Sequence, residues 1–275
     1  MLISRRAKLS LRTVALLYLL LLLLLPVAVV FGKTFEHGFG EAWSWISTPA
    51  AVSAFWLSLL MAAIAVPLNT IFGVVCALVL VRRRGRAAAV IDSLIDLPFL
   101  VSPVIVGLAL TLVYGIHGWF GTWFVDHGIQ IIFAPAGMVL ATIFVSLPFV
   151  VREVAPLLVE IGDEQEQAAA TLGASDWQTF WRVTLPSIRW GVAYGVVLST
   201  ARALGEIGAV LVVSSLVAGQ TLTLPLLVFE RASQIGPGST TGSYAAATEL
   251  AVMSLVVLLA MTLLGPKRTK AEKVK

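Results

Sequence analysis

Two charged residues lie one helical turn apart inside a strongly apolar run of the sequence. Arg202 and Glu206 belong to the segment TARALGEIGA, residues 200–209. In a helix that enters the membrane at Trp190, Arg202 lies roughly 18 Å along the axis, near the middle of a bilayer. Either charge costs about 2.5–3.5 kcal/mol there on insertion scales, so both side chains must face protein or water. The i,i+4 spacing also allows the two to pair on one helix face.

Two roles for this pair remain open. A buried ion pair can fix the packing of neighbouring helices. Alternatively, the face borders an anion path, where Arg202 offers charge and hydrogen-bond donors to a passing oxyanion and Glu206 keeps that anion from binding too tightly.

A second apolar run carries polar interruptions, IDSLIDLPFLVSPVIVGLAL, residues 91–110. Pro98 and Pro103 each remove a backbone donor, and Ser102 adds a hydroxyl. The freed backbone groups cannot face lipid, so this helix either packs inside the bundle as a proline-kinked helix or lines a water-filled path.

One long polar segment separates the membrane-length runs, Glu164–Pro186. Residues 163–172 are rich in Ala, Glu and Gln, which predicts a helix, and Gly173 can supply the left-handed residue that ends it. Ser175 with Gln178 three residues later forms a capping box for a second, short helix. Pro186 is expected to stop or kink that second helix.

The second helix has one large aromatic face. Trp177, Phe180, Trp181 and Thr184 follow an i, i+3, i+4, i+7 spacing. A short aromatic-faced helix after a glycine turn suits a groove in a soluble partner, although a helix that only lies on lipid headgroups is the plainer alternative.

The elements that position these residues are membrane spans, since 59% of the residues are hydrophobic and only 12% are charged. A bilayer core of about 30 Å needs ~20 helical residues. Six runs meet that length, at residues 13–31, 52–81, 97–116, 131–151, 190–217 and 244–264. Pro67 predicts a kink in the second run.

The basic residues set the orientation of these spans. If the N-terminus is cytoplasmic, then of the 19 Lys and Arg residues only Lys33 and Arg231 fall on the outer side, and Arg202 falls within a span. The remainder collect on the inner side, which by the positive-inside rule places both termini and the Glu164–Pro186 loop in the cytoplasm. The net charge of +4 therefore reflects membrane orientation and gives no indication of nucleic-acid binding.

Other chemistry has little support in the sequence. The single Cys76 cannot form an intrachain disulfide, and His37, His117 and His127 lack metal-ligand spacing. The sequence contains no Gly-x4-Gly-Lys-Ser/Thr loop, so we expect ATP to be bound elsewhere.

The polar segment resembles the EAA loop of ABC importer permeases, which docks on the ATPase subunit. The resemblance rests on Ala168 and Ala169, then Gly173, and after nine residues Val183-x-Leu185-Pro186. Gln167 stands where the motif usually has Glu, with Glu166 one place earlier. On this resemblance the ATPase-coupling residues are Glu166, Gln167, Ala168, Ala169, Gly173, Trp177, Phe180, Leu185 and Pro186.

A longer resemblance covers about residues 96–226. DLPFLVSP, GWFG, DHGI, GMVLAT, PFVVRE, LGASDWQTFWRVTLP, RALGEIGAV and TLPL occur in this order, as in W-type permease subunits of bacterial sulfate/thiosulfate importers. Ile207 stands where the fifth-helix signature commonly has Phe. The resemblance favours pore lining, with Arg202, Glu206, Ser102, Pro98 and Pro103 along the anion path.

This resemblance implies an all-α polytopic membrane protein of six transmembrane helices with the type I ABC importer permease fold. Residues 1–12 would be a cytoplasmic tail, 13–49 the first span and an outer loop, 50–264 the transmembrane domain with its coupling loop at 160–186, and 265–275 a basic cytoplasmic tail. The implied partners are a second, T-type permease, two copies of a cytoplasmic ATPase that carries ATP and Mg, an extracytoplasmic sulfate/thiosulfate-binding protein and the lipid bilayer. No cofactor is expected on this chain itself.

Three alternatives remain. A homodimeric molybdate or tungstate permease would need no T-type partner. An ion-coupled secondary transporter could use Arg202, Glu206 and Glu249 as an ionisable relay. A membrane scaffold would transport nothing. For Glu249 the default expectation is pairing within the bundle.

Overall fold

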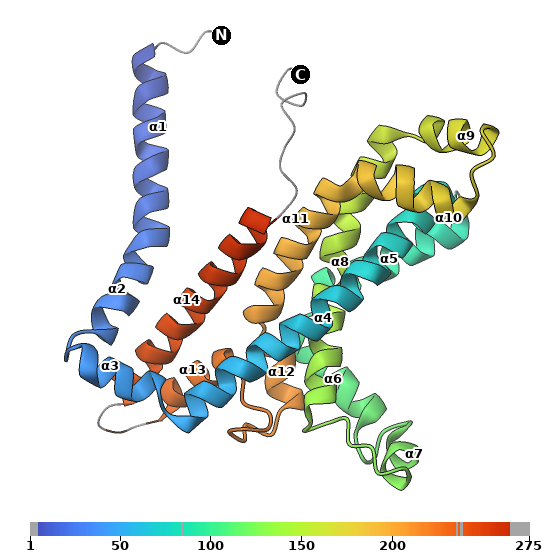
Figure 1. Cartoon of the computed structure of the whole chain (residues 1–275). Helices are drawn as coiled ribbons and strands as arrows, with labels where there is room; N and C mark the ends of the chain where they lie inside the picture. The colour runs from blue at the N-terminus through green and yellow to red at the C-terminus, as the bar shows by residue number, and fades with distance from the viewer. Residues whose placement is uncertain (1–4, 84, 235, 237–238, 265–275) are drawn as a thin grey trace.

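Long apolar helices form the body of the molecule in the computed structural model (Figure 1). The structure describes residues 5–83, 85–234, 236 and 239–264. The larger elements are α1 (Arg5–Leu19), a π-helical turn η1 (Leu20–Leu24), α2 (Leu25–Thr34), α3 (Phe39–Ile46), α4 (Pro49–Arg82), α5 (Arg86–Leu100), α6 (Pro103–Tyr114), α8 (Pro135–Ile161), α11 (Leu185–Leu204) and α14 (Ser239–Leu264). Shorter elements are α7 (Gly121–Asp126), α9 (Glu164–Thr171), α10 (Asp176–Thr179), the π-helical turn η2 (Phe180–Thr184), α12 (Gly208–Val213) and α13 (Leu224–Ser233).

The described helices include four that are long and apolar enough to cross a membrane: the run Leu11–Thr34, α4, α8 and α14. A fifth candidate is the pair α5 and α6, which are bent by 112° at their junction. The predicted tail at residues 265–275 and residues 1–4 of the other predicted tail lie outside the described residues.

The predicted third and fifth spans are wrong as single helices. The third divides at Val101 and Ser102, between α5 and α6. The fifth divides after Leu204, at the end of α11, and α12 is only a short helix beyond the gap. The α4 helix continues through Pro67, and α8 extends past the predicted end at residue 151 to Ile161.

Three helices, α4, α8 and α11, pack closely at the centre. A Cβ added at Gly73 on α4 would lie 2.7 Å from the Cβ of Val150 on α8, and one added at Gly195 on α11 would lie 2.8 Å from the Cα of Val150. Asn69 on α4 also donates to Ser146 Oγ on α8 at 2.8 Å. Small residues and an interhelical hydrogen bond are the usual means of helix association in lipid, so these three helices form one tightly packed unit.

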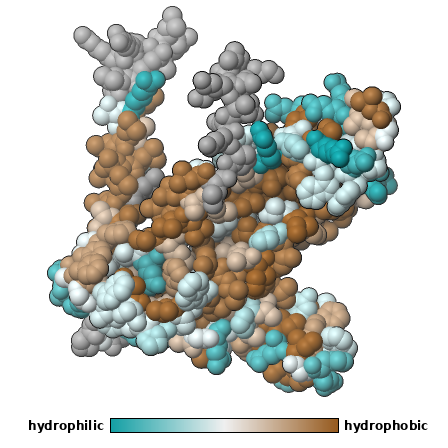
Figure 2. Space-filling model, in the orientation of Figure 1, coloured by the Kyte–Doolittle hydropathy of each residue, from teal (hydrophilic) through white to brown (hydrophobic). Residues whose placement is uncertain are grey.

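The bundle has two polar ends and an apolar middle (Figure 2). The start of α1, the end of α14 and the α9–α10 segment all lie at one end, called here the loop end (Figure 1). The elements α3, α7 and α13 lie at the opposite end.

Candidate functional site

A left-handed glycine turn shapes the Glu164–Pro186 loop, as predicted. Gly173 has φ +86° directly after α9, and an added Cβ would meet no atom within 4 Å. The N–H of Gly173 donates to Ala170 O at 2.9 Å, and the N–H of Ala174 donates to Ala169 O at 3.0 Å. This pair of bonds is the Schellman motif, which satisfies the last carbonyls of α9.

The predicted capping box is also present. Ser175 Oγ accepts from Gln178 N at 3.3 Å, and the Gln178 side chain accepts from Ser175 N at 3.0 Å. The turn and the cap together fix the direction in which α10 leaves Gly173.

The aromatic side chains that follow form a compact, exposed cluster. The rings of Trp177 and Trp181 lie 5.5 Å apart, and Phe180 lies 5.3 Å from Trp181. Trp177 is 70% exposed and Trp181 is 50% exposed. Phe180 instead packs partly against the core at the loop end. Two large aromatic rings therefore present free surface at the loop end.

Thr184 does not share the exposed face of this cluster. The Thr184 side chain is buried, and its hydroxyl donates to Glu166 Oε1 at 2.7 Å. The π-helical turn η2, which runs from Phe180 to Thr184, changes the register of side chains around the helix.

Pro186 does not stop the helix. The N–H of Leu185 bonds to Phe180 O, five residues back, and α11 continues directly from η2. A proline ring normally clashes with the carbonyl four residues earlier. The wider π turn immediately before Pro186 shifts that register, so the aromatic segment is continuous with the helix that leads into the membrane.

The remaining residues of the loop motif divide by exposure. Gln167 and Ala168 are exposed on α9, and Ala169 and Leu185 are half-buried. Glu166 is the one that makes strong contacts: its Oε1 atom accepts from Thr184 and lies 2.8 Å from Nη2 of Arg82, the last residue of α4. The contact with Arg82 was missed because an arginine in a basic turn is already explained by membrane orientation. The sequence did carry one signal for this contact: Glu166 lies one place before the position where the motif usually has Glu.

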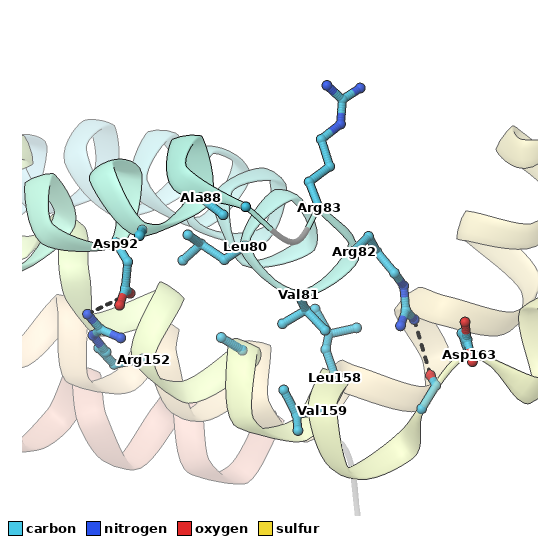
Figure 3. Close-up of a pocket in the computed structure, with 14 residues that line it drawn as sticks. Leu80, Val81, Arg82, Arg83, Ala88, Asp92, Arg152, Leu158, Val159 and Asp163 are labelled. Carbon is cyan, nitrogen blue, oxygen red and sulfur yellow. Dashed lines mark hydrogen bonds and ion pairs between the residues drawn. The ribbon is translucent and has the colours of Figure 1, made fainter.

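A polar cavity of about 900 Å³ opens between the loop-end portions of α4, α5 and α8 (Figure 3). On one wall, Arg152 of α8 holds two acids of α5: Nε donates to Asp96 Oδ1 at 2.9 Å, and Nη2 lies 2.9 Å from Asp92 Oδ1. On another wall, Arg82 donates to Gly162 O at 3.2 Å. The ion pairs of Arg152 therefore connect α5 with α8, and the ion pair of Arg82 with Glu166 connects α4 with α9.

The two interrupted spans break at the same place in the bundle. Ser102 and Pro103 mark the break between α5 and α6, and a Cβ added at Gly208, where α12 begins, would lie 2.9 Å from Pro103 Cβ. A Cβ added at Gly107 on α6 would lie 2.7 Å from Ala209 O. The paired breaks thus pack backbone against backbone, which only small residues permit.

Pro98 and Pro103 play different parts in this arrangement. Pro98 is buried within α5, which continues past it, while Pro103 begins α6. The sequence predicted kinks in a single helix, and the structure instead shows a complete break at Ser102.

Arg202 and Glu206 are paired, as the spacing allowed, with Arg202 Nη2 2.6 Å from Glu206 Oε2. They do not share one helix face, because α11 ends at Leu204 and Glu206 lies in the break. Glu206 Oε1 accepts from Ala209 N, in the first turn of α12, at 2.8 Å. The Glu206 side chain is 1% exposed and the Arg202 side chain is 30% exposed. The carboxylate is therefore fixed at the break, and the guanidinium retains access to its surroundings.

Ser102 and Glu249 stand apart from this pair. Ser102 is exposed at the neighbouring break, and among the described residues no hydrogen bond joins it to Arg202 or Glu206. The expected pairing of Glu249 is not found within the described part of the chain either: it lies on α14 in an apolar pocket with Phe31 and Trp43, and its buried Oε2 has no hydrogen-bond partner there.

An apolar helical bundle with paired helix breaks at its centre, a fixed carboxylate in one break and an aromatic loop at one end has the construction of a membrane transport permease. The chain belongs to the family of binding-protein-dependent transport system inner membrane components, whose family model matches residues 69–270.

Similar proteins agree with that assignment. The chain is 49% identical to the sulfate transport system permease protein CysW of Synechocystis sp., over 92% of this chain and 91% of that protein. It is 38% identical to the sulfate transport system permease protein CysT of the same organism, over 91% and 87%. A crystal structure of a bacterial alginate ABC transporter, in complex with a periplasmic protein bound to an alginate pentasaccharide, matches with TM-score 0.76 and 16% identity over 92% of each chain. That likeness concerns the fold.

Proposed function

We propose that this chain is the W-type permease subunit of an ATP-driven importer of sulfate and thiosulfate. The observation that carries the proposal is the near full-length identity to a sulfate permease of the W type, 49% over 91% of that relative. The paired breaks and the aromatic loop supply the geometry that such a subunit needs. The lesser identity to a T-type permease supports a pore built from two related but different subunits.

The Glu164–Pro186 loop is the docking element for a cytoplasmic ATPase. Trp177 and Trp181 present free aromatic surface at a direction fixed by Gly173 and the Ser175 cap. An aromatic knob on a short helix fits a groove in a partner. Two copies of the ATPase bind ATP with Mg, and their closure draws the two permease loops together, opening the pore outward. Hydrolysis then resets the pore.

The paired breaks border the anion path. A hydrated oxyanion loses part of its water shell on entry, so the path must offer replaceable hydrogen-bond donors. Arg202 supplies these from the end of α11, and the nearby carboxylate of Glu206 competes for the same guanidinium. That competition lowers the net affinity and lets the anion leave.

The loop end faces the cytoplasm. The basic residues of the sequence collect on the side that carries this loop, and the start of α1 and the end of α14 lie at the same end (Figure 1). An extracytoplasmic sulfate-binding protein would then deliver its anion to the opposite end.

The proposal is tested by purifying the chain together with the T-type permease and the ATPase, and reconstituting them into vesicles. Uptake of labelled sulfate should require ATP, the binding protein and both permeases. Uptake driven by a proton or sodium gradient without ATP would refute it. Uptake of molybdate in preference to sulfate, by this chain without a T-type subunit, would also refute it.

A further inference from the structure

The helix α9 lacks the apolar anchor that orients most helices. None of its residues, Glu164–Thr171, is buried. Burial of an amphipathic face normally decides how a short helix sits, because an eight-residue helix is not stable alone. Some other contact must therefore set the angle of α9, and with it the angle of the Gly173 turn.

One carboxylate oxygen makes that contact. Glu166 Oε1 lies 2.8 Å from Arg82 Nη2 and accepts from Thr184 Oγ1 at 2.7 Å. Arg82 is the last residue of α4, and Thr184 is the last residue of η2, directly before α11. A single atom of α9 is thus joined to the ends of two helices that continue into the bundle.

Arg82 extends the same contact to a third helix. Its Nη2 also donates to the carbonyl of Gly162, the residue that ends α8 in a left-handed conformation with φ +73° (Figure 3). The α8 and α11 helices are covalently continuous with the loop, but α4 is not. Among the contacts described, Arg82 is the ionic link between α4 and the loop.

We propose that Glu166 is a positioning residue: with Arg82, Thr184 and the Gly162 carbonyl it forms a clamp that holds the ATPase-docking loop at one angle and passes the movement of that loop to α4. The inference rests on the proposed function, in which the ATPase docks on Glu164–Pro186. It adds a second route into the bundle, besides the covalent connections through α8 and α11.

The charges explain why this clamp serves position more than stability. The side chains of Arg82 and Glu166 are 27% and 24% exposed, so water still reaches and partly screens the pair, which limits its contribution to folding stability. The charged Arg82 and the Thr184 hydroxyl both contact the same oxygen of Glu166, and such charge-assisted contacts still restrict the orientation of that side chain strongly. Breaking the clamp should therefore leave the bundle folded while α9 loses its fixed direction.

The test compares a set of variants in the purified complex with the T-type permease and the ATPase. Glu166→Ala removes both contacts, Glu166→Gln keeps an acceptor for Thr184 without the charge, and Arg82→Gln removes the link to α4. Arg83→Gln is the matched control, since it removes a positive charge from the same turn, and the exposed Arg83 side chain extends away from Gly162 and Asp163 (Figure 3). Two quantities are measured: ATPase copies per permease pair, and sulfate transported per ATP hydrolysed.

We expect Glu166→Ala and Arg82→Gln to lower sulfate transported per ATP by about fivefold or more, the factor that loss of one modest interaction gives. The double variant Arg82→Gln with Glu166→Gln should be no worse than the poorer single variant, because the two groups act as one unit. Arg82→Lys should recover part of the loss. Arg83→Gln should match the unaltered protein.

Unchanged transport per ATP and unchanged ATPase content in Glu166→Ala would overturn the clamp. An effect in Glu166→Ala with none in Arg82→Gln would overturn the link to α4. Failure of the docking function itself is recognised separately: Trp177→Ala with Trp181→Ala would then retain the ATPase and full uptake, whatever the clamp variants do.

Discussion

Replacing Gly173 by valine tests whether the loop must be presented at one angle. Gly173 has φ +86°, and an added Cβ would meet nothing within 4 Å. The whole penalty is therefore conformational, since no neighbour is displaced. A side chain in the left-handed region costs about 1–2 kcal/mol, and a branched Cβ lies at the upper end of such values.

A cost of that size shifts the turn towards other conformations by a factor of about 5–30. Those conformations lose the bonds from Gly173 N to Ala170 O and from Ala174 N to Ala169 O. Trp177 then points in a different direction, although no membrane helix has been altered. We expect the permease pair to insert and assemble while the ATPase dissociates or hydrolyses ATP without transport.

The assay is co-purification of the ATPase together with sulfate uptake in vesicles. Gly173→Asn is the matched control, because asparagine adopts the left-handed conformation more readily than other residues with a side chain. Gly173→Ala should fall between asparagine and valine. A full complement of ATPase and full uptake in Gly173→Val would mean that the angle of this loop is not what couples hydrolysis to transport.

Further variants address the anion path, the orientation and the paired breaks. The double variant Arg202→Met with Glu206→Gln leaves neither charge unpaired, so the complex should assemble. Sulfate uptake should be lost if the pair borders the anion path. Retained uptake would mean that the pair serves helix packing alone. A cysteine at Ser239 should react with a membrane-impermeant thiol reagent added outside, and one at Arg83 only after access from inside; the reverse pattern would invert the topology. Gly107→Ala places a methyl 2.7 Å from a backbone carbonyl oxygen of α12, which should destabilise the bundle by about 1–3 kcal/mol. The thermal transition temperature of the purified complex should fall. An unchanged transition temperature would show that the breaks are not tightly packed.

Local chemistry in the loop could be predicted from sequence alone. Gly173, the Ser175–Gln178 box and the aromatic spacing act over a few residues, so the rules for turns and caps applied directly. The effect of Pro186 could not be predicted in the same way, because a single π turn changed the hydrogen bond that the proline would have disrupted.

The breaks were harder to predict than the spans. Pro98, Ser102 and Pro103 interrupt residues 97–116, and Arg202 and Glu206 interrupt residues 190–217, but both runs stay apolar enough to span a bilayer. These residues therefore indicated a kink or a polar face, and they did not indicate a division into two helices. Each break depends on the other, since the contact between Pro103 and Gly208 joins distant parts of the chain. The contact between Arg82 and Glu166 also joins distant parts of the chain. Helix ends that meet only in the folded chain leave no periodic pattern of residues in the sequence.

The contact between the two breaks also limits how the two short helices beside them can move. Since there is no room even for a methyl group between Gly107 and the carbonyl of Ala209, α6 and α12 cannot approach each other further. Any movement that would narrow the space between them is therefore blocked by backbone atoms, and these two short helices can change their spacing only by separating.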